Sequence, residues 1–287
     1  MAHDPQRTPL WDIGRLRLPL ARTPLLMGIV NVTPDSFSDG GRYLDRAAAQ
    51  RHALRLVEEG ADLVDVGGES SRPGASAVSE EEELARVVPV IREIRAHTDV
   101  PLSIDTTKAS VARAALEEGA DIVNDISGLR FDAGMQPLLA ASACGVVLMH
   151  MQGEPRTMQQ APHYDDVVRE VRSWLDERLH VLLDSGIAGA RVVVDPGIGF
   201  GKRYEDNVEL LRHLEALRVA GRPLLIGASR KAFLGSLLQE PHPAQRLEGD
   251  LAVGAACYRA GVELLRVHDV GAARRFFRVL ETLDPSA

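Results

Sequence analysis

The sequence is short of lysine and asparagine. Only three of its 33 basic residues are lysine, and only three residues of the chain are asparagine. These positions are Lys108, Lys202, Lys231, Asn31, Asn124 and Asn207. All the lysines and two of the asparagines fall at or just beyond apparent strand ends. Arginine replaces lysine readily on a solvated surface but often not in a binding site. We therefore interpret these positions as places where substitution fails.

Other absences exclude whole classes of protein. No run of about 18 apolar residues is present, so no transmembrane helix is expected. The first residues lack the basic and then apolar pattern of a signal peptide. The two cysteines, Cys144 and Cys257, are far apart in apolar surroundings, which predicts buried free thiols. Together these features predict a cytoplasmic protein without a membrane partner.

The charge pattern argues against nucleic acid as a partner. The formal net charge is −8 and no basic block interrupts the sequence, whereas nucleic-acid surfaces need clustered Lys and Arg. An anionic small molecule remains possible, because local clusters set the field inside a cleft. With 287 residues, of which 45% are hydrophobic, the chain can bury the core of one large domain or two average ones.

Short apolar segments alternate with amphipathic segments along the chain. The first of them, residues 25–32, runs into a polar loop that closes at Gly40 and Gly41. Apparent strands, some with their loops, span 25–32, 62–68, 101–106, 121–128, 145–151, 191–202, 223–231 and 262–269. Predicted helices span 44–59, 109–118, 164–185, 205–219 and 246–260, with one beginning at Ser79 and a last one ending near residue 283.

About eight such units predict a single (β/α)8 TIM barrel over residues 25–287. Residues 1–24 are predicted to form a short arm or hairpin that packs on it. A doubly wound open sheet is the alternative. That fold favours a glycine-rich turn after the first strand with an acid about 20 residues later, and this pattern is absent.

Polar side chains follow almost every predicted strand, and a barrel would bring them to one rim. The Asp and Asn side chains of this rim suit the N–H groups of a heterocycle, and its Arg, Lys and His side chains suit phosphate. The amide oxygen of Asn31 suits Mg²⁺. His150 fits a nucleophile or base, but a structural histidine beside Met149 and Met151 is the favoured interpretation. The set is Asn31, Asp35, Asp39, Ser71, Arg72, Asp105, Asn124, His150, Asp195, Lys202, Ser229, Arg230, Lys231, Arg266 and His268.

Seven motifs in order carry a resemblance that covers residues 25–283. They are NVTPDSFSDGG at 31–41, GESSRPG at 68–74, SIDT at 103–106, NDI at 124–126, DPGIGFGK at 195–202, GASRK at 227–231 and RVHDV at 266–270. The chain resembles the dihydropteroate synthases. The resemblance implies condensation of 6-hydroxymethyl-7,8-dihydropterin diphosphate with p-aminobenzoate, giving 7,8-dihydropteroate and pyrophosphate in folate biosynthesis.

The resemblance also implies a role for each matching residue. The catalytic residues are Asp39 and Arg72, and the Mg²⁺ ligand is Asn31. The pterin ring is held by Asp105, Asn124, Asp195, Lys231 and Arg266. The diphosphate is bound by Ser71, Arg266 and His268, and p-aminobenzoate by Ser71, Pro73, Phe200 and Ser229. Family members often have threonine where this chain has Ser71, which keeps the hydroxyl and removes a methyl group.

A non-catalytic pterin-binding paralogue and a methyltetrahydrofolate-dependent methyltransferase are the alternative functions. Lys108 and Lys202 fit a solvated helix start as well as a site, and residues 235–250 have no assigned role. The family commonly forms dimers through barrel helices, so a homodimer is expected, with Phe276, Phe277 and Leu280 as candidates for its face.

Overall fold

The computed structural model describes residues 9–33, 41–71, 74–75 and 77–284, without the side chains of 41–45. Eight parallel strands form its central sheet in the order β8-β7-β6-β5-β4-β3-β10-β9. A parallel bridge between Val194 and Leu224 joins the two edges and closes a barrel. The strands are β3 (Leu25–Asn31), β4 (Leu63–Gly67), β5 (Leu102–Asp105), β6 (Ile122–Asp125), β7 (Gly145–Met149), β8 (Val192–Asp195), β9 (Leu225–Ile226) and β10 (Leu264–Val267).

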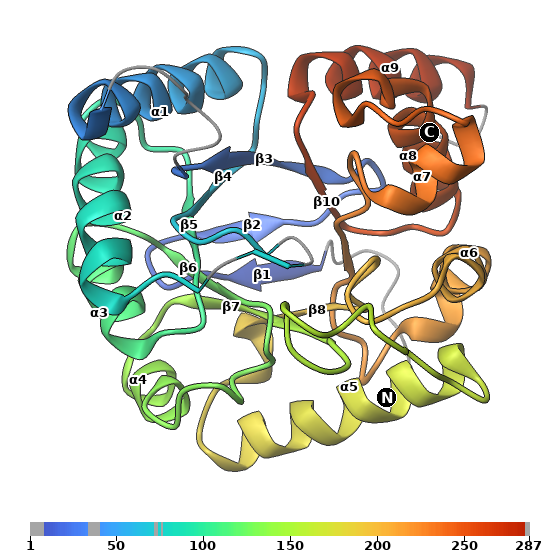
Figure 1. The fold of residues 1–287 in the computed structure, drawn as a ribbon, viewed down its shortest axis with the longest axis horizontal. Coiled ribbons are helices and arrows are strands. Elements are labelled where there is room, and N and C mark those ends of the chain that lie inside the picture. Colours follow the sequence, from blue (N-terminus) through green and yellow to red (C-terminus); the bar gives the residue numbers. More distant parts are fainter. Residues whose placement is uncertain (1–8, 34–40, 72–73, 76, 285–287) are drawn as a thin grey trace.

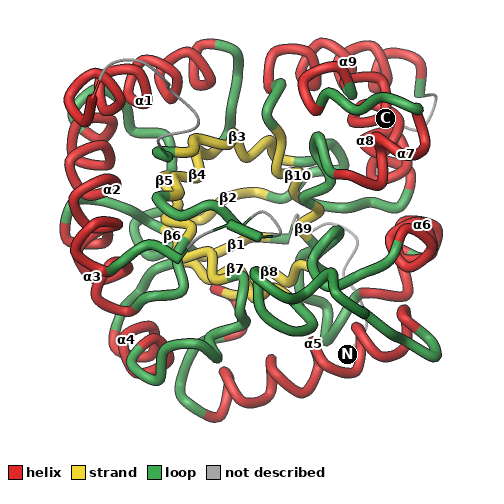
Figure 2. The backbone as a smooth tube through the Cα atoms, in the orientation of Figure 1, coloured by secondary structure: helices red, strands yellow, loops and turns green. Residues whose placement is uncertain are grey.

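Helices surround this ring of strands, as Figures 1 and 2 show. Apolar side chains between strands and helices form the main core. This is the predicted (β/α)8 barrel. The α-helices are α1 (Gly41–Glu58), α2 (Glu80–Arg95), α3 (Ala109–Glu117), α4 (Met135–Ala141), α5 (Val167–Asp184), α6 (Tyr204–Arg212), α7 (Ala232–Leu238), α8 (Leu247–Arg259) and α9 (Val270–Leu283). Short 3-10 helices are η2 (Gly189–Arg191), η3 (Leu214–Leu217) and η4 (Pro243–Gln245).

An antiparallel hairpin of β1 (Leu10–Asp12) and β2 (Arg17–Pro19) closes the end of the barrel where the strands begin. The side chains of Trp11, Ile13 and Leu20 pack against apolar residues of seven barrel strands, Met27 and Val193 among them. The Trp11 indole N–H donates to the Arg191 carbonyl at 2.8 Å. The predicted N-terminal hairpin is therefore a plug, and it leaves the carboxyl ends of the strands as the open mouth.

The structure corrects some predicted elements. The short helices α4 and α7 were not predicted, and the helix predicted over 205–219 ends at Arg212 and continues as η3. The seventh strand, β9, is only two residues long. Ser79 caps α2 as predicted, and its hydroxyl accepts from the Glu82 N–H at 3.2 Å. Phe277 is 1% exposed and belongs to the core, so its assignment to a dimer face was wrong.

Two further sequence predictions concern the cysteines and the membrane. Cys144 and Cys257 are buried free thiols, as predicted. None of the helices in the described ranges is long and apolar enough to cross a membrane.

Candidate active site

Arg266 connects four strands at the mouth of the barrel. Its side chain, from β10, donates from Nε to Asp65 Oδ2 at 2.6 Å and from Nη2 to Asp105 Oδ2 at 2.8 Å. The Asn124 amide, from β6, donates to the same Asp65 oxygen at 3.1 Å. The barrel thus brings Asp105, Asn124 and Arg266 together, as the sequence predicts, around one additional carboxylate.

Sequence reasoning missed Asp65. It is fully buried in the middle of β4, and its other oxygen, Oδ1, has no hydrogen-bond partner among the described residues. A buried carboxylate is costly unless it is paired. An acid inside the apolar run Leu63–Gly67 was the one available signal.

The ion pairs of this cluster shift the pKa values of Arg266 and Asp105. Burial alone would lower the pKa of Arg266, but Asp65 and Asp105 outweigh it and raise the pKa. Burial raises the pKa of Asp105 to about 7; the ion pair with Arg266 opposes this shift and the Asp65 carboxylate adds to it. Arg266 therefore stays charged, whereas Asp105 changes its charge near neutral pH.

Lys231 and Asp195 form a second charged group beside the first. Asp195 ends β8 and accepts from the Gly197 N–H at 2.7 Å. Lys231 Nζ donates to the Ile198 carbonyl and lies 4.1 Å from the centre of the Phe200 ring. Gly199 makes this approach possible, because a Cβ there would lie 2.7 Å from Lys231 Cδ.

Burial shifts both pKa values of this group. It lowers the pKa of Lys231 to about 7, although the Asp195 carboxylate opposes the shift. It raises the pKa of Asp195, and the Lys231 ammonium and the Gly197 N–H oppose that shift. Carboxylates and cations with shifted pKa values in one mouth are typical of a functional site.

Ser229 and His268 meet at the adjoining edge of the mouth. Ser229 Oγ donates to Asp250 Oδ2 at 2.7 Å, lies 3.0 Å from His268 Nδ1, and accepts from the His268 backbone N–H at 3.2 Å. Asp250 also accepts from the Arg230 backbone N–H at 2.9 Å. Asp250 is a site neighbour that the sequence did not predict.

The region 235–250, to which the sequence assigned no role, holds the Ser229–Lys231 turn. Arg246 is 7% exposed and donates to the carbonyls of Arg230 (2.8 Å) and Lys231 (3.2 Å). It also donates to the carbonyls of Glu240 (3.0 Å) and Pro241 (2.9 Å). Arg230 adopts a left-handed backbone conformation with φ +60°, which is uncommon for a residue with a side chain. Arg246, at the N-cap of α8, therefore fixes the position of Lys231.

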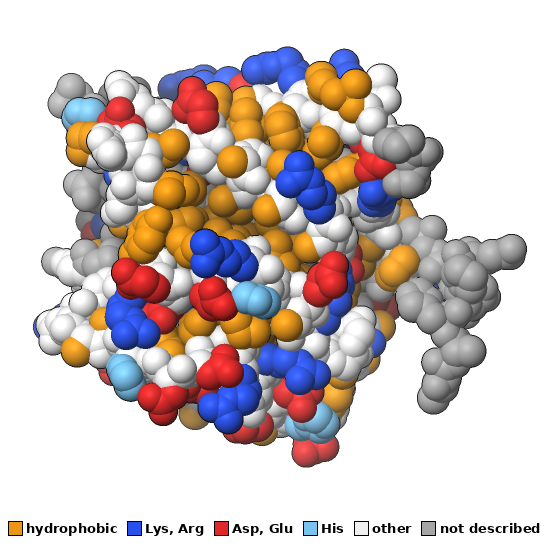
Figure 3. Space-filling view, turned by 90° about the vertical axis from the view of Figure 1, so that its right-hand side faces the viewer, with side chains coloured by type: hydrophobic (Ala, Val, Ile, Leu, Met, Phe, Trp, Pro, Cys, Tyr) orange, Lys and Arg blue, Asp and Glu red, His pale blue; other side chains and the backbone are white. Residues whose placement is uncertain are grey.

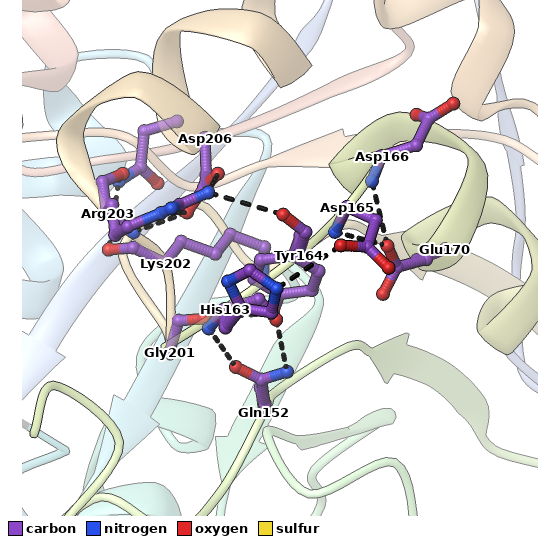
Figure 4. A network of polar contacts seen from close by, with 11 residues as sticks. Gln152, His163, Tyr164, Asp165, Asp166, Glu170, Gly201, Lys202, Arg203 and Asp206 are labelled. Atoms are coloured by element: carbon purple, nitrogen blue, oxygen red, sulfur yellow. Dashed lines mark hydrogen bonds and ion pairs between the residues drawn. The ribbon is translucent and has the colours of Figure 1, made fainter. Parts of the chain in front are cut away.

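The loops after β7 and β8 are tied to each other, as Figure 4 shows. Within the loop after β7, the Gln152 side chain accepts from the His163 N–H at 3.1 Å and donates to the His163 carbonyl at 3.0 Å. The Tyr164 hydroxyl donates to the Gly201 carbonyl at 2.9 Å, and Arg203 donates to the Tyr164 carbonyl at 3.4 Å. These contacts brace the loop that carries Phe200.

A buried pair lies beneath that loop. Lys202 Nζ is 2.9 Å from His150 Nδ1 and donates to the Phe200 carbonyl at 3.1 Å. Lys202 is 2% exposed and His150 is 5% exposed. Burial lowers the pKa of Lys202 to about 7, and burial together with the Lys202 charge lowers the pKa of His150 well below its ordinary value. His150 therefore supports the loop as a neutral imidazole.

We expect Lys202→Met to flatten the pH dependence of stability. The folded pKa of Lys202 is about 7, below the value of about 10.4 in an unfolded chain. Between these values the unfolded state binds more protons, so the free energy of unfolding rises with pH, by at most about 1.4 kcal/mol per pH unit for one group. Urea unfolding at about pH 7.5 and about pH 9.5 measures this slope.

The matched control is Arg212→Met, because Arg212 is 70% exposed. It should leave the slope unchanged. Equal slopes in the Lys202→Met variant and the unaltered protein would show that Lys202 stays charged in the fold.

Lys108 anchors the loop after β4. Its Nζ donates to Glu69 Oε2 at 2.6 Å and to Glu83 Oε2. The Glu83 side chain is 1% exposed, and its Oε1 has no partner among the described residues. Burial would lower the pKa of Lys108, but the hydrogen bonds that Lys108 donates to the two carboxylates outweigh it and raise the pKa. Lys108 is therefore held in ion pairs and is not a solvated residue at the start of a helix.

We expect Lys108→Met to lower the free energy of unfolding by about 3 kcal/mol, because it leaves the buried Glu83 carboxylate unpaired. Adding Glu83→Gln should recover part of that loss, since no buried charge then remains. Urea unfolding of the single and double variants measures the coupling. Strict additivity would contradict the pairing.

The remaining predicted residues divide into two groups. Asn31 lies half-buried at the end of β3, and Ser71 lies half-buried after β4. Asp39, Arg72 and Pro73, like Asp35, fall outside the described residues. The structure therefore places the predicted pterin residues, together with Ser229, Phe200 and His268, at one mouth of the barrel.

Known proteins match this chain over most of its length. A family model described as "Pterin binding enzyme" matches residues 27–268. A dihydropteroate synthase from Neisseria meningitidis serogroup B is 46% identical over 279 residues, which are 96% of this chain and 97% of that protein. The chain belongs to the dihydropteroate synthase family.

Solved structures of this family have the same fold. Xanthomonas albilineans dihydropteroate synthase with 4-aminobenzoic acid is 48% identical, with a TM-score of 0.90, and the match covers 97% of this chain and 100% of that one. The dihydropteroate synthase of the same organism in complex with 7,8-dihydropteroate is 44% identical, with a TM-score of 0.85, and covers 96% and 98%.

Proposed function

We propose that the chain condenses 6-hydroxymethyl-7,8-dihydropterin diphosphate with p-aminobenzoate, giving 7,8-dihydropteroate and pyrophosphate in folate biosynthesis. One observation carries this proposal: Asp195 with Lys231, and Asp105 with Arg266, stand at the same barrel mouth. An aminopyrimidine edge presents N–H groups beside a carbonyl oxygen, so it needs carboxylate acceptors and a cationic donor together. A sulfonamide, as an analogue of p-aminobenzoate, would compete for the site.

The hydrogen bonds already present support the proposed pterin contacts. Asp195 and Asp105 accept from ring N–H groups, and Lys231 donates to the ring carbonyl and a ring nitrogen. Since the Asn124 amide nitrogen donates to Asp65, its carbonyl oxygen is left to accept from the ring. Arg266 uses two of its five N–H groups on Asp65 and Asp105, and its plane can stack on the pterin.

The second substrate and the leaving group take the adjoining edge. His268, Arg266 and Ser71 contact the diphosphate, and Phe200, Pro73, Ser71 and Ser229 line the p-aminobenzoate site. In the structure the Ser229 hydroxyl donates to Asp250. It must turn from Asp250 if it is to donate to the carboxylate of p-aminobenzoate.

Asn31 fits a Mg²⁺ ion that is held mostly by water and substrate phosphate. Among the described residues no group of three His, Cys, Asp or Glu could hold a metal, so a cage of protein ligands is not part of the proposal. Mg²⁺ commonly takes one protein oxygen and completes its shell with waters and phosphate oxygens, and Asn31 supplies such an oxygen. When bound, the ion would neutralise charge on the diphosphate.

The reaction begins with cleavage of the bond between the pterin methylene carbon and the diphosphate oxygen. The electron pair leaves with pyrophosphate, whose growing charge Arg266 and His268 stabilise. The pterin methyl cation that remains is stabilised by Asp39 and by the acids that hold the ring. Arg72 is the second catalytic residue of the proposal. The neutral amine of p-aminobenzoate then attacks the carbon, forms the C–N bond and releases one proton to solvent.

Mass spectrometry of the products tests this function. The protein, given both substrates and Mg²⁺, should form 7,8-dihydropteroate. Binding of the pterin without product would instead support the non-catalytic paralogue. Methyl transfer from methyltetrahydrofolate, with no dihydropteroate formed, would support the methyltransferase.

We expect Asp39→Ala to lower kcat by about 100-fold, because the carboxylate acts on charge that exists only in the transition state. Pterin affinity should change much less, and calorimetric titration with the pterin measures it separately. Intact turnover in this variant would contradict the role of Asp39.

A homodimer is also part of the proposal. The face of the molecule formed by α6 to α9, turned toward the viewer in Figure 3, carries a broad group of hydrophobic side chains. Leu237, Val279 and Leu283 are 58%, 58% and 73% exposed, whereas Phe276 and Leu280 are half-buried. Sedimentation that gives only monomer at micromolar concentration would contradict a dimer.

The free thiols fit the proposed cytoplasmic location.

A further inference from the structure

The Ser229 hydroxyl group has three hydrogen-bonding neighbours but only one proton to donate. Its oxygen lies 2.7 Å from Asp250 Oδ2 and 3.0 Å from His268 Nδ1, and it accepts from the His268 backbone N–H. A hydroxyl group has one proton, and an ionised carboxylate can only accept. The Ser229 proton is therefore directed at Asp250, and the contact with His268 Nδ1 needs a proton from the imidazole ring.

We propose that Asp250 is a positioning residue that, acting through Ser229, holds the proton of neutral His268 on Nδ1. Neutral imidazole carries a single N–H, so this arrangement makes Nε2 the bare nitrogen. The Asp250 carboxylate behind the hydroxyl group also stabilises the imidazolium form of His268. In that form Nδ1–H donates to Ser229, and Nε2–H donates to the diphosphate. Where the inference concerns the diphosphate, it rests on the proposed function.

Asp250 is well fixed for this task. Its Oδ1 accepts from the Arg230 backbone N–H at 2.9 Å, so each carboxylate oxygen has its own donor. Arg230 is held in its left-handed conformation by this bond, by the bond from Arg246 to its carbonyl, and by the paired contact of its guanidinium with Asp269 at 2.8 Å. The carboxylate therefore meets the Ser229 hydroxyl at a constant position.

The same geometry makes Asp250→Asn an informative change. The Arg230 N–H requires an acceptor, so it selects the amide oxygen and turns the new NH₂ group toward Ser229 Oγ. That group donates where the carboxylate accepted, and the Ser229 proton then turns to His268 Nδ1. We expect the neutral imidazole to change from the Nδ1–H to the Nε2–H tautomer.

Long-range ¹H–¹⁵N correlation spectra of histidine-labelled protein measure the tautomer directly, since the protonated and bare ring nitrogens have well-separated shifts. Spectra are recorded on the ligand-free protein at a pH where the rings are neutral, and His268→Gln identifies the signals among the nine histidines. Asp269→Asn is the matched control, because Asp269 contacts the Arg230 side chain in the same loop. It should leave the His268 tautomer unchanged.

The outcomes separate this inference from the proposed function. Nδ1–H in the unaltered protein and Nε2–H in Asp250→Asn would support it, whether or not the protein makes dihydropteroate. Nε2–H in the unaltered protein would overturn it, as would a tautomer that Asp250→Asn leaves unchanged. During turnover by Asp250→Asn, the neutral His268 imidazole replaces the imidazolium as donor to the diphosphate. The KM for the dihydropterin diphosphate should therefore rise about 5-fold.

Discussion

Lys231→Met should reduce kcat/KM for the dihydropterin diphosphate by about 100-fold or more, because it removes a charged donor from a largely desolvated site. The effect has two parts. The ring carbonyl loses its partner, and the pKa of Asp195 rises further because the Lys231 charge no longer opposes burial. A protonated Asp195 accepts fewer N–H bonds from the pterin.

Steady-state kinetics and calorimetric titration with the pterin check this expectation together. Methionine keeps most of the side-chain volume, so the melting temperature should show that the fold persists. Arg212→Met is the control, since it removes an exposed cation from the outer helix α6. Near-normal kcat/KM in Lys231→Met would remove Lys231 from the site.

Arg266→Met should cause the largest loss of stability together with loss of activity. The change leaves Asp65, which is fully buried, and Asp105 side by side without their shared cation. Removing one partner from a buried ion pair costs about 3–5 kcal/mol. One of the two carboxylates should respond by taking up a proton. The loss of unfolding free energy should therefore be smaller at low pH than at high pH.

Urea unfolding at several pH values measures this effect. Arg274→Met is the matched control, because Arg274 also pairs with an aspartate, Asp62, but the two side chains are 30% and 32% exposed. Its loss should cost at most about 1 kcal/mol. Equal destabilisation by the two changes would contradict the buried role of Arg266.

The predictable part of the molecule is the part that repeats. Each barrel strand is a short apolar run that ends in polar residues, so Asp105, Asn124, Asp195 and Arg266 could be assigned to one rim before any contact was known. The helices α4 and α7 were missed because each is seven residues long. Less than two full turns give little helical periodicity to detect.

The two residues that the sequence did not predict, Asp65 and Asp250, hold other side chains of the site in place. Asp65 lies within a strand, and its importance depends on Arg266, which is 201 positions later. Asp250 lies in a weakly patterned region, and its contact with Ser229 spans 21 positions. Pairings of this kind depend on how the barrel closes, which no local pattern encodes.

We propose that this barrel mouth couples cleavage of the dihydropterin diphosphate to attack by p-aminobenzoate. The most direct measurement is pyrophosphate release with Mg²⁺, in the presence and absence of p-aminobenzoate. We predict sustained release only when p-aminobenzoate is present, and loss of that release in Lys231→Met. Absence of release from a protein that still binds the pterin, or release that Lys231→Met leaves intact, would contradict this coupling.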